Sequence, residues 1–404
     1  MARRQYDVTL FGATGFTGRL AARYLSEHAP PGLRWAVAGR SRAKLELLQA
    51  ETHATGLVVA DSGDPAAVDA MVGDARVLAS TVGPFAHHGN AVVAACVRDG
   101  TDYVDITGET AWVRGLIDRH HAAAAAAGTR IVPFCGFDSV PSDLGALLVA
   151  SWIRDRWGQD TRRVSASFAL RGGYGGGTVA TVLNSAETGE LAVGRDVLLL
   201  NPPERASDAE RARSADLDAV CYDPVRRTWL APFAMARINT RVVRRSNALL
   251  DAIGHGYGPE FAYEEAGEHR TRAAAEATRL ALRLFERALA SERARSLLRR
   301  IGPVPGEGPP EGAREQGAMR LRLVAEGASG RQVLATLRAR GDPGSRVTVM
   351  ILSEAALALA TQRDALPPAP GGGVLTPATG IGLLLLDRLE AVGVQVEVGP
   401  VVRP

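Results

Sequence analysis

The chain has 404 residues, of which 46% are hydrophobic and 23% charged, and its net charge is +3. These proportions are ordinary for a globular protein, so they exclude disordered and fibrous classes, and the small charge argues against a nucleic-acid partner. Two domains with sizeable cores are expected at this length. The three cysteines lie far apart, which argues against disulfides and a metal site and fits a reducing cytoplasm.

The first forty residues alternate between apolar runs and glycine-rich turns. An apolar run ends at Phe11, and glycines follow at 12, 15 and 18 before a helix-like stretch. In a strand–turn–helix unit, such glycines let backbone N–H groups approach a pyrophosphate at the positive end of the helix. The pattern therefore predicts a dinucleotide site, formed by Gly12, Thr14, Gly15, Phe16, Thr17 and Gly18.

A second apolar run ends in Gly39-Arg40-Ser41. Sites that prefer NAD usually carry an acidic residue here, which accepts from the ribose 2′-hydroxyl. A guanidinium cannot accept, but it pairs well with a 2′-phosphate. We therefore predict NADP(H), bound by Arg40 and Ser41, with Asp61 from the end of the third strand as a further contact.

The strand–helix alternation continues to about residue 150. Further strands are predicted over 57–61, 76–82, 102–106 and 130–135, with helices between them. Six strands in this pattern predict a doubly wound, Rossmann-type parallel sheet with right-handed crossovers, over residues 1–150. A helix over 142–157, capped by Ser142 and Asp143, leads out of this domain.

From residue 158 the pattern is mixed and predicts a second, α+β substrate domain over 158–345. A strand over 164–170 enters a glycine cluster at 172–177, which covers the active site or loops round it. One amphipathic helix is expected over 271–300, and a hairpin over 319–340. Helices near 347–360 and 381–392 suggest that residues 346–404 pack back on the first domain.

Three strand ends carry unusual loops. The fourth strand leads to Val82, Gly83 and Pro84, the fifth to Asp105, Thr107 and Glu109, and the sixth to Asp138, Ser139 and Asp143. Each residue has a structural alternative, because Gly-Pro loops are common turns and acids can cap helices. Ligands of open α/β sheets nevertheless lie beyond the carboxyl ends of the strands, so three such loops at one edge favour a site there.

Other reactive side chains are weaker candidates. His88 is a candidate proton donor, but His87 and His88 are poor metal ligands because no third ligand is evident. Cys135 could be a nucleophile, although a thiol near a strand end is more often buried and inert. Arginine is a poor proton donor and forms no Schiff base, so lysine chemistry would rest on Lys44, the only lysine.

Four arginines lie within residues 237–245. They could receive a phosphate or the surface of a carrier protein. The alternative, which is slightly favoured, is an edge strand with solvated arginines.

Together these segments resemble the saccharopine dehydrogenase-like family, most closely its actinobacterial trans-acting enoyl reductase branch. The matching segments are residues 11–18, 38–41, 81–85, 105–109 and 135–144, with 240–249, 305–309 and 375–378 beyond them. The resemblance implies NADP(H)-dependent reduction of an enoyl thioester carried on a polyketide synthase that lacks its own enoyl reductase domain. Hydride would reach the β-carbon and a proton the α-carbon.

The resemblance also suggests roles for individual residues. His88, Asp138 and Ser139 are the expected catalytic residues, with Ser139 or backbone N–H groups facing the enolate oxygen. The arginines at 237–245 could meet a phosphopantetheine phosphate. The family commonly has tyrosines in the Gly-Pro loop where this chain has Phe85 and His88, so His88 or water would serve as proton donor.

Two other functions stay open. An amino-acid or imine reductase of the saccharopine dehydrogenase type needs paired carboxylate receptors and, in some branches, a lysine. A lipid-associated scaffold with a vestigial dinucleotide fold is of a different class. The sequence has no signal peptide and no uncharged run of the roughly 20 residues of a membrane span, so a cytoplasmic protein without an integral membrane segment is expected. Peripheral membrane attachment and a homo-oligomer are left open.

Overall fold

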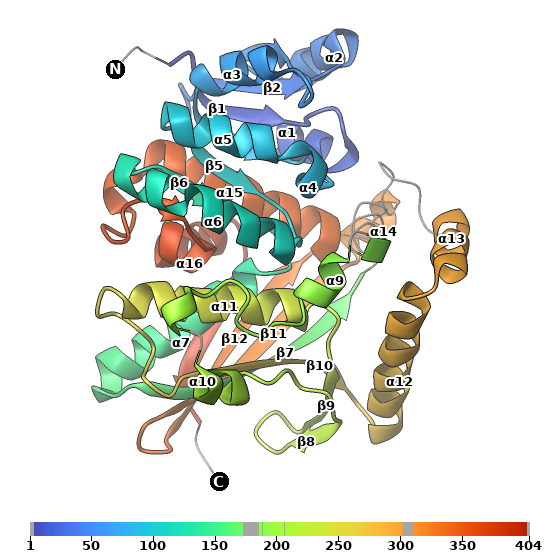
Figure 1. Cartoon of the computed structure of the whole chain (residues 1–404), viewed down its shortest axis with the longest axis vertical. Helices are drawn as coiled ribbons and strands as arrows, with labels where there is room; N and C mark the ends of the chain where they lie inside the picture. The colour runs from blue at the N-terminus through green and yellow to red at the C-terminus, as the bar shows by residue number, and fades with distance from the viewer. Residues whose placement is uncertain (1–3, 173–185, 188, 206, 302–309, 402–404) are drawn as a thin grey trace.

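The computed structural model describes residues 4–172, 186–187, 189–205, 207–301 and 310–401 (Figure 1). The predictions for the glycine cluster beyond Gly172 and for the segment 305–309 fall outside these residues. Within them the chain forms two seven-stranded sheets, one above the other in Figure 1, with helices packed around and between them.

The first sheet is parallel throughout, in the order β13-β6-β5-β4-β1-β2-β3. Its N-terminal strands are β1 (Tyr6–Phe11), β2 (Trp35–Gly39), β3 (Gly56–Val59), β4 (Ala75–Ser80), β5 (Asp102–Asp105) and β6 (Arg130–Val132). The order 3-2-1-4-5-6 reverses between β1 and β4, where such sheets bind dinucleotides. The predicted doubly wound sheet is confirmed.

Helices cover both faces of this sheet, and every residue of β2 is buried, as its unbroken apolar run requires. One face carries α1 (Phe16–His28), α2 (Arg42–Thr52) and α15 (Thr348–Thr361). The other carries α3 (Pro65–Gly73), α5 (Asn90–Asp99) and α6 (Thr110–Ala127), with the short α4 (Phe85–His88) before α5.

The second sheet is mixed, in the order β14-β12-β11-β7-β10-β9-β8. Its strands are β7 (Thr161–Arg171), β8 (Cys221–Asp223), β9 (Thr228–Pro232), β10 (Ala262–His269), β11 (Ala318–Gly327), β12 (Gln332–Arg340) and β14 (Gln395–Pro400). Strands β7 and β10 are parallel, and the predicted hairpin β11–β12 is confirmed. Helix α7 (Val140–Trp157) packs on β7, β11 and β12.

The C-terminal segment belongs to both sheets. Helix α15 packs against α1, β1, β4 and β5, and β13 (Gly373–Val374) extends the first sheet beside β6. Strand β14 instead pairs with β12 in the second sheet. The expected helices therefore exist, but the segment also supplies one strand to each sheet. The domain boundaries themselves stay a prediction.

Residues 237–245 lie in a helix, so the favoured interpretation as a solvated edge strand was wrong. Helix α11 (Ala236–Asp251) lies between α7 and β10 and is buried on most sides. Arg241 and Arg245 are each 1% exposed, and Arg244 is 3% exposed. The usual helical spacing of apolar residues was hidden because several buried positions are themselves arginines.

The remaining elements connect the two sheets or lie outside them. They are α9 (Glu190–Val193), α10 (Asp208–Arg213), α12 (Arg272–Leu289), α13 (Glu292–Ile301), α14 (Glu311–Glu315), α16 (Pro377–Gly380), α17 (Leu383–Ala391) and the single turns Pro203–Arg205, Pro343–Val347 and Arg363–Ala365. The single helix expected over 271–300 is thus broken in two. The stretch Pro343–Thr361 has the length and apolar character of a membrane span, but 78% of it is buried, as in a core helix.

Candidate functional site

Gly12 forms the turn between β1 and α1, with φ +85°. A Cβ at this position would lie 2.7 Å from both Thr81 Oγ1 and Val82 Cγ2, in the loop that follows β4. Only glycine fits this crowded, left-handed position without strain. The first loop and the loop after β4 therefore meet across Gly12, at the point where the strand order reverses.

The other two glycines shape the start of α1. A Cβ on Gly18 would lie 2.1 Å from the Gly12 carbonyl oxygen, so the helix packs directly on the turn. Gly15 is the exposed N-cap residue and has no side chain to occupy the helix end. The N–H groups of a first helical turn lack intrahelical partners and favour an anion. The space left by these glycines, which larger residues would fill, fits a pyrophosphate.

Arg40 lies at the end of β2, beside the first loop. A Cβ on Gly39 would be 3.7 Å from Thr14 Oγ1, so the two loops adjoin. The Arg40 side chain is exposed and makes no hydrogen bond or ion pair with any residue that the structure describes, and Ser41 begins α2 without using its hydroxyl as a cap. Both groups are available to a 2′-phosphate. Asp61 is exposed and its Oδ1 accepts from the Gly63 N–H at 2.9 Å; its contact with the cofactor stays a prediction.

The three strand-end loops are joined by two carboxylates of the loop after β5. The Glu109 carboxylate accepts the N–H groups of Phe85 and Ala86, each at 2.8 Å, at the start of α4. Asp105 accepts the Phe134 N–H at 3.1 Å, just beyond β6. The predicted convergence of these loops at one sheet edge is therefore observed, and neither acid caps its own helix.

The chain turns sharply after β6. Phe134 is buried with φ +66°, a conformation that costs a bulky residue energy and is held here by Asp105. Burial raises the pKa of Asp105 to about 7, although the Thr107 and Phe134 N–H groups favour its charged form. The turn directs residues 135–139 across the edge of the sheet toward the start of α7.

Asp138 differs from Asp105, Glu109 and Asp143 in its lack of a hydrogen-bonding partner among the described residues. It is half-buried, and its carboxyl makes no hydrogen bond or ion pair with the rest of the described chain. Burial raises the pKa of Asp138 to about 7, and no other group shifts it. A carboxyl with this pKa can hold a proton at neutral pH and release it to a ligand.

Ser139 faces the other way, into the protein. Its buried hydroxyl donates to Asn239 Oδ1 at 3.2 Å, and Asn239 Nδ2 donates to Glu265 at 2.6 Å. Glu265 also accepts from Ser142 at 2.7 Å and from Tyr263 at 2.9 Å, while burial raises its pKa to about 7. Ser139 thus connects the loop to α11 and β10 and is not free to face a substrate oxygen.

Asp143 and Ser142 do not cap the start of α7, contrary to the sequence prediction. Helix α7 begins at Val140, and both side chains are buried. Asp143 accepts from Ser246 of α11 and from the Ala378 N–H at 2.8 Å, at the start of α16. It therefore joins three helices.

His88 is held by a different loop from Asp138 and Ser139. Its Nδ1 is 2.9 Å from Ser62 Oγ, in the loop after β3. Strands β3 and β6 are five positions apart, or on the order of 20 Å at about 4.8 Å per strand. The His88 ring is thus tied to the loop after β3, whereas Asp138 and Ser139 follow β6, and of these two neighbours Ser139 faces into the protein.

Comparison with known proteins agrees with this geometry. Residues 8–132 match the saccharopine dehydrogenase NADP binding domain. The chain is 39% identical to a Mycobacterium tuberculosis protein over 98% of this chain and 97% of that one. It is 36% identical to a protein of Mycobacterium leprae named trans-acting enoyl reductase, over 97% of both chains. The chain belongs to the trans-acting enoyl reductase family.

Two solved structures share the whole architecture with this family member. Saccharopine dehydrogenase (L-Glu forming) of Saccharomyces cerevisiae is 14% identical, with TM-score 0.52 over 98% of this chain and 99% of that one. Homospermidine synthase of Legionella pneumophila, solved with NAD, is 10% identical, with TM-score 0.53 over 98% and 91%. At these identities the likeness concerns the fold. The chain is an NADP-dependent oxidoreductase by its family and its dinucleotide-binding domain.

The arginines of α11 are committed to the protein in this enoyl reductase family member. Arg241 donates to Asp216 at 2.6 Å, and Arg244 to the Val197 carbonyl at 2.9 Å. Arg245 donates to two carbonyls, and the exposed Arg237 pairs with Glu286 at 2.9 Å. A phosphopantetheine phosphate would have to displace these partners, so the implied phosphate-binding role is not supported.

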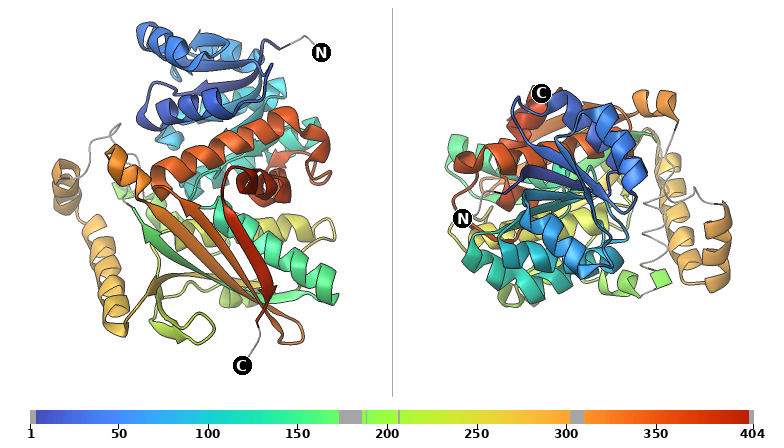
Figure 2. Two further views of the ribbon diagram at one scale, coloured as in Figure 1. Left: turned by 180° about the vertical axis from the view of Figure 1, so that it is seen from behind. Right: turned by 90° about the horizontal axis from the view of Figure 1, so that it is seen from above.

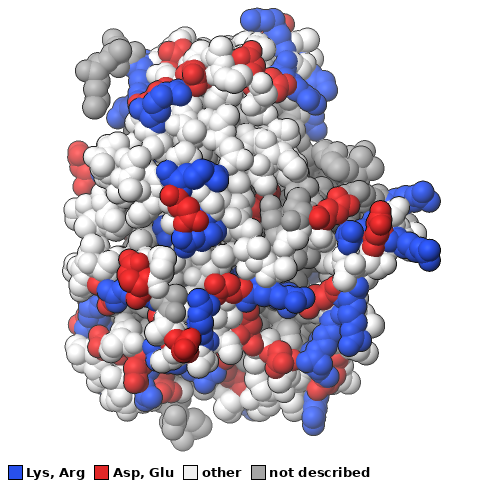
Figure 3. Space-filling model, viewed as in Figure 1, with Lys and Arg blue, Asp and Glu red and all other residues white. Residues whose placement is uncertain are grey.

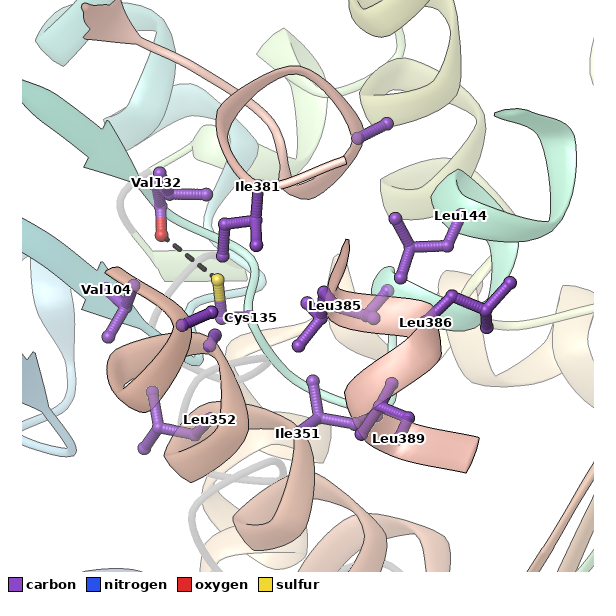
Figure 4. Packing of buried hydrophobic residues seen from close by; sticks show 14 of the residues in the cluster. Val104, Val132, Cys135, Leu144, Ile351, Leu352, Ile381, Leu385, Leu386 and Leu389 are labelled. Carbon is purple, nitrogen blue, oxygen red and sulfur yellow. Dashed lines mark hydrogen bonds between the residues drawn. The ribbon is translucent and has the colours of Figure 1, made fainter. Parts of the chain in front are cut away.

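Cys135 is the inert thiol that was expected. It is completely buried among apolar side chains of α15, α17 and the segment between α16 and α17, including Leu352, Leu385 and Ile381 (Figure 4). Its Sγ lies 3.3 Å from the Val132 carbonyl oxygen, and burial raises its pKa well above the usual value. A thiolate is therefore disfavoured at this position.

Arg40 provides a direct test of the cofactor orientation. Arg40→Gln should weaken NADPH binding by about 10- to 100-fold, because a charge-assisted hydrogen bond is worth about 1.5–3 kcal/mol, and should leave NADH binding unchanged. Fluorescence titration of both cofactors measures the difference. Arg42→Gln is the matched control, since this exposed arginine faces Glu46 at 3.8 Å. Equal losses for NADPH and NADH would contradict the assignment.

Glu109 is a positioning residue that sequence reasoning left without a role. In Glu109→Gln, an amide nitrogen would face one of the two N–H groups, so we expect a stability loss of about 1–3 kcal/mol and a raised KM for NADPH. Thermal unfolding and initial rates measure these effects. The control is Glu51→Gln, which removes an exposed pair with Arg23. An unchanged KM together with lowered stability would leave Glu109 a purely structural residue.

Proposed function

We propose that this protein reduces the α,β double bond of an enoyl thioester with NADPH. The observation that carries the proposal is Asp138, an unpartnered acid whose pKa is raised to about 7 at the carboxyl edge of a dinucleotide-binding sheet. Saturating an enoyl group requires a proton at the α-carbon after hydride addition at the β-carbon. An acid held protonated near neutral pH suits this step.

Each loop at this edge of the first sheet then has a role in binding NADPH or in the reaction. Bound NADPH supplies the hydride. The glycine turn and Arg40 hold the two ends of its adenosine diphosphate part, and the loop of Val82, Gly83 and Pro84 lies on the nicotinamide side, fixed by Glu109. Asp138 gives its proton to the α-carbon and, being half-buried, regains one from solvent.

Negative charge on the thioester oxygen needs compensation during the reaction. Ser139 is engaged with Asn239, so we assign this task to the dipole of α7, an 18-residue helix that begins two residues after Asp138. The Val140 N–H already donates to the Gly136 carbonyl at 3.1 Å and Pro141 has no N–H, so the dipole acts without a direct hydrogen bond from these two residues. The partial positive charge of a helix start stabilises an anion placed near it. Asp138 and the start of α7 therefore act on the α-carbon and the oxygen of one enolate.

The deciding experiment is NADPH oxidation with crotonyl-pantetheine, followed by identification of the product. Stoichiometric formation of butyryl-pantetheine is the expected result. Turnover of imino acids alone would favour the amino-acid or imine reductase. Tight NADPH binding without turnover of either substrate would favour the scaffold.

The substrate is proposed to be carried on an acyl-carrier domain of a polyketide synthase in the cytoplasm. The support is the name shared by the mycobacterial relatives, which describes an enoyl reductase that acts in trans. The same crotonyl group on an isolated carrier domain should give a higher kcat/KM than on free pantetheine. Equal values would show that the carrier protein is not recognised.

A further inference from the structure

Helices α12 and α13 form an arm at one side of the molecule, with α12 beside the β9 edge of the second sheet (Figure 1). Helix α12 contacts the body through β9 and β10, and α13 follows it and contacts α12. Only Ala275 and Leu289 of α12 are buried, although the helix is 18 residues long. We refer to residues 272–301 as the arm.

The arm presents large apolar side chains to solvent. Leu280 is 56% exposed, Leu284 54%, Phe285 42% and Leu297 57%. Leu280 and Leu284 are four residues apart and so lie on one helix face, opposite the buried Ala275 and Leu289. Single exposed leucines are ordinary, but these four make up nearly half of the large exposed hydrophobic residues found in the described chain.

The arm is also strongly basic. It contains eight arginines and three glutamates, a net charge of +5 in a chain whose total is +3. Arg279 pairs with Glu276, and Glu286 is already paired with Arg237 of α11. By contrast, Arg287, Arg293 and Arg300 are exposed and pair with no group among the residues described. Figure 3 shows arginine groups projecting at this edge of the molecule.

The exposed apolar side chains and unpaired arginines of the arm distinguish between the possible binding partners. A second copy of this chain on the same face would bring arginines against arginines, because a two-fold interface repeats the same patch on both sides. An acidic protein surface would pair with the arginines, but its charged groups would give the exposed leucines no apolar partner. An anionic bilayer satisfies both, since phosphate headgroups meet arginines and the acyl boundary receives leucine and phenylalanine.

We propose that the arm binds the surface of an anionic phospholipid bilayer, with Leu280, Leu284 and Phe285 at the acyl boundary. This surface lies outside the cofactor site and does not depend on which reaction the site performs. The protein would then act beside a membrane that holds or receives its lipid-like substrate or product.

Sedimentation of the full-length protein with vesicles tests the proposal. Binding to phosphatidylcholine vesicles containing 30% phosphatidylglycerol is expected to exceed binding to pure phosphatidylcholine by at least about tenfold and to weaken with salt. The variant L280S/L284S/F285S should lose at least about tenfold in binding, and R287Q/R293Q/R300Q should lose the preference for phosphatidylglycerol. The control is Leu47→Ser, which changes a 73% exposed leucine on α2.

Unchanged NADPH binding shows that each variant is folded. Absence of vesicle binding by the wild type, or equal binding by the apolar triple variant, overturns the proposal. So does a dimer that dissociates in the triple variant during equilibrium sedimentation, because the arm is then an interface between copies. Binding of an acidic carrier domain to the arm, without binding of vesicles, also overturns the proposal.

Discussion

Replacement of Asp138 by asparagine is expected to lower kcat for enoyl reduction by about 10²- to 10⁴-fold, the usual contribution of a positioned proton donor. The amide has nearly the same shape but holds no transferable proton. Because no described residue hydrogen-bonds to the Asp138 carboxyl, the substitution breaks no contact in the protein. The dissociation constant for NADPH should therefore change less than about twofold, while kcat falls.

The pH dependence provides a second measurement on the same residue. Burial raises the pKa of Asp138 to about 7, so the acid form predominates below this pH and is lost above it. The kcat of the wild type should fall about tenfold per unit well above pH 7, and this slope should be absent in Asp138→Asn. A wild-type rate that rises through pH 7 would exclude Asp138 as the donor.

His88→Gln is the matched control for the competing donor. The His88 ring is engaged with Ser62 after β3, so this substitution should change kcat by less than about threefold. A loss of more than about 100-fold in His88→Gln, with Asp138→Asn unaffected, would reverse the assignment.

The largest effect on stability is expected from Arg245→Met in α11. Arg245 is 1% exposed and donates to the Leu200 carbonyl at 2.6 Å and the Val374 carbonyl at 2.5 Å. Methionine fills much of the space but leaves both carbonyls buried without a donor. Since each orphaned polar group costs about 1–3 kcal/mol, we expect the free energy of unfolding to fall by about 3 kcal/mol in urea denaturation.

Two further variants separate this effect from a general loss of charge. Arg237→Met changes an exposed arginine of the same helix, whose surface pair with Glu286 should contribute less than about 1 kcal/mol. Arg245→Lys keeps the charge but cannot reach two carbonyls with a planar fork, so it should be intermediate. Equal stability of Arg245→Met and Arg237→Met would show that the buried hydrogen bonds contribute little.

The dinucleotide-binding sheet could be predicted because its signals are local. The glycines at 12, 15 and 18, the apolar strands and Arg40 each lie within short segments, and a doubly wound order follows from strand–helix alternation. The convergence of three loops could be predicted from the same topology. The individual hydrogen bonds between these loops, such as that from the Phe85 N–H to Glu109, depend on side-chain geometry. The spacing of residues along the sequence does not determine that geometry.

The sequence predictions that were wrong share one physical cause, because the side chains concerned are buried by residues distant in the sequence. Arg241, Arg244 and Arg245 look like surface residues by type, yet distant carbonyls and Asp216 accept hydrogen bonds from them inside the protein. Ser139 was expected to face a substrate, but Asn239, one hundred positions away, takes its hydrogen bond. Partners of this kind could be found from correlated substitutions among relatives, not from a single chain.

The C-terminal segment has a mechanical consequence for the whole enzyme. The chain passes between the two sheets after β6, after β12 and again after α17, and β13 returns to the first sheet before β14 enters the second. Any motion of one sheet relative to the other must therefore bend three connections at once, which restricts it to motions that all three permit. It also means that no single cut yields two complete halves, since an N-terminal fragment would lack α15 and leave the faces of β1, β4 and β5 uncovered.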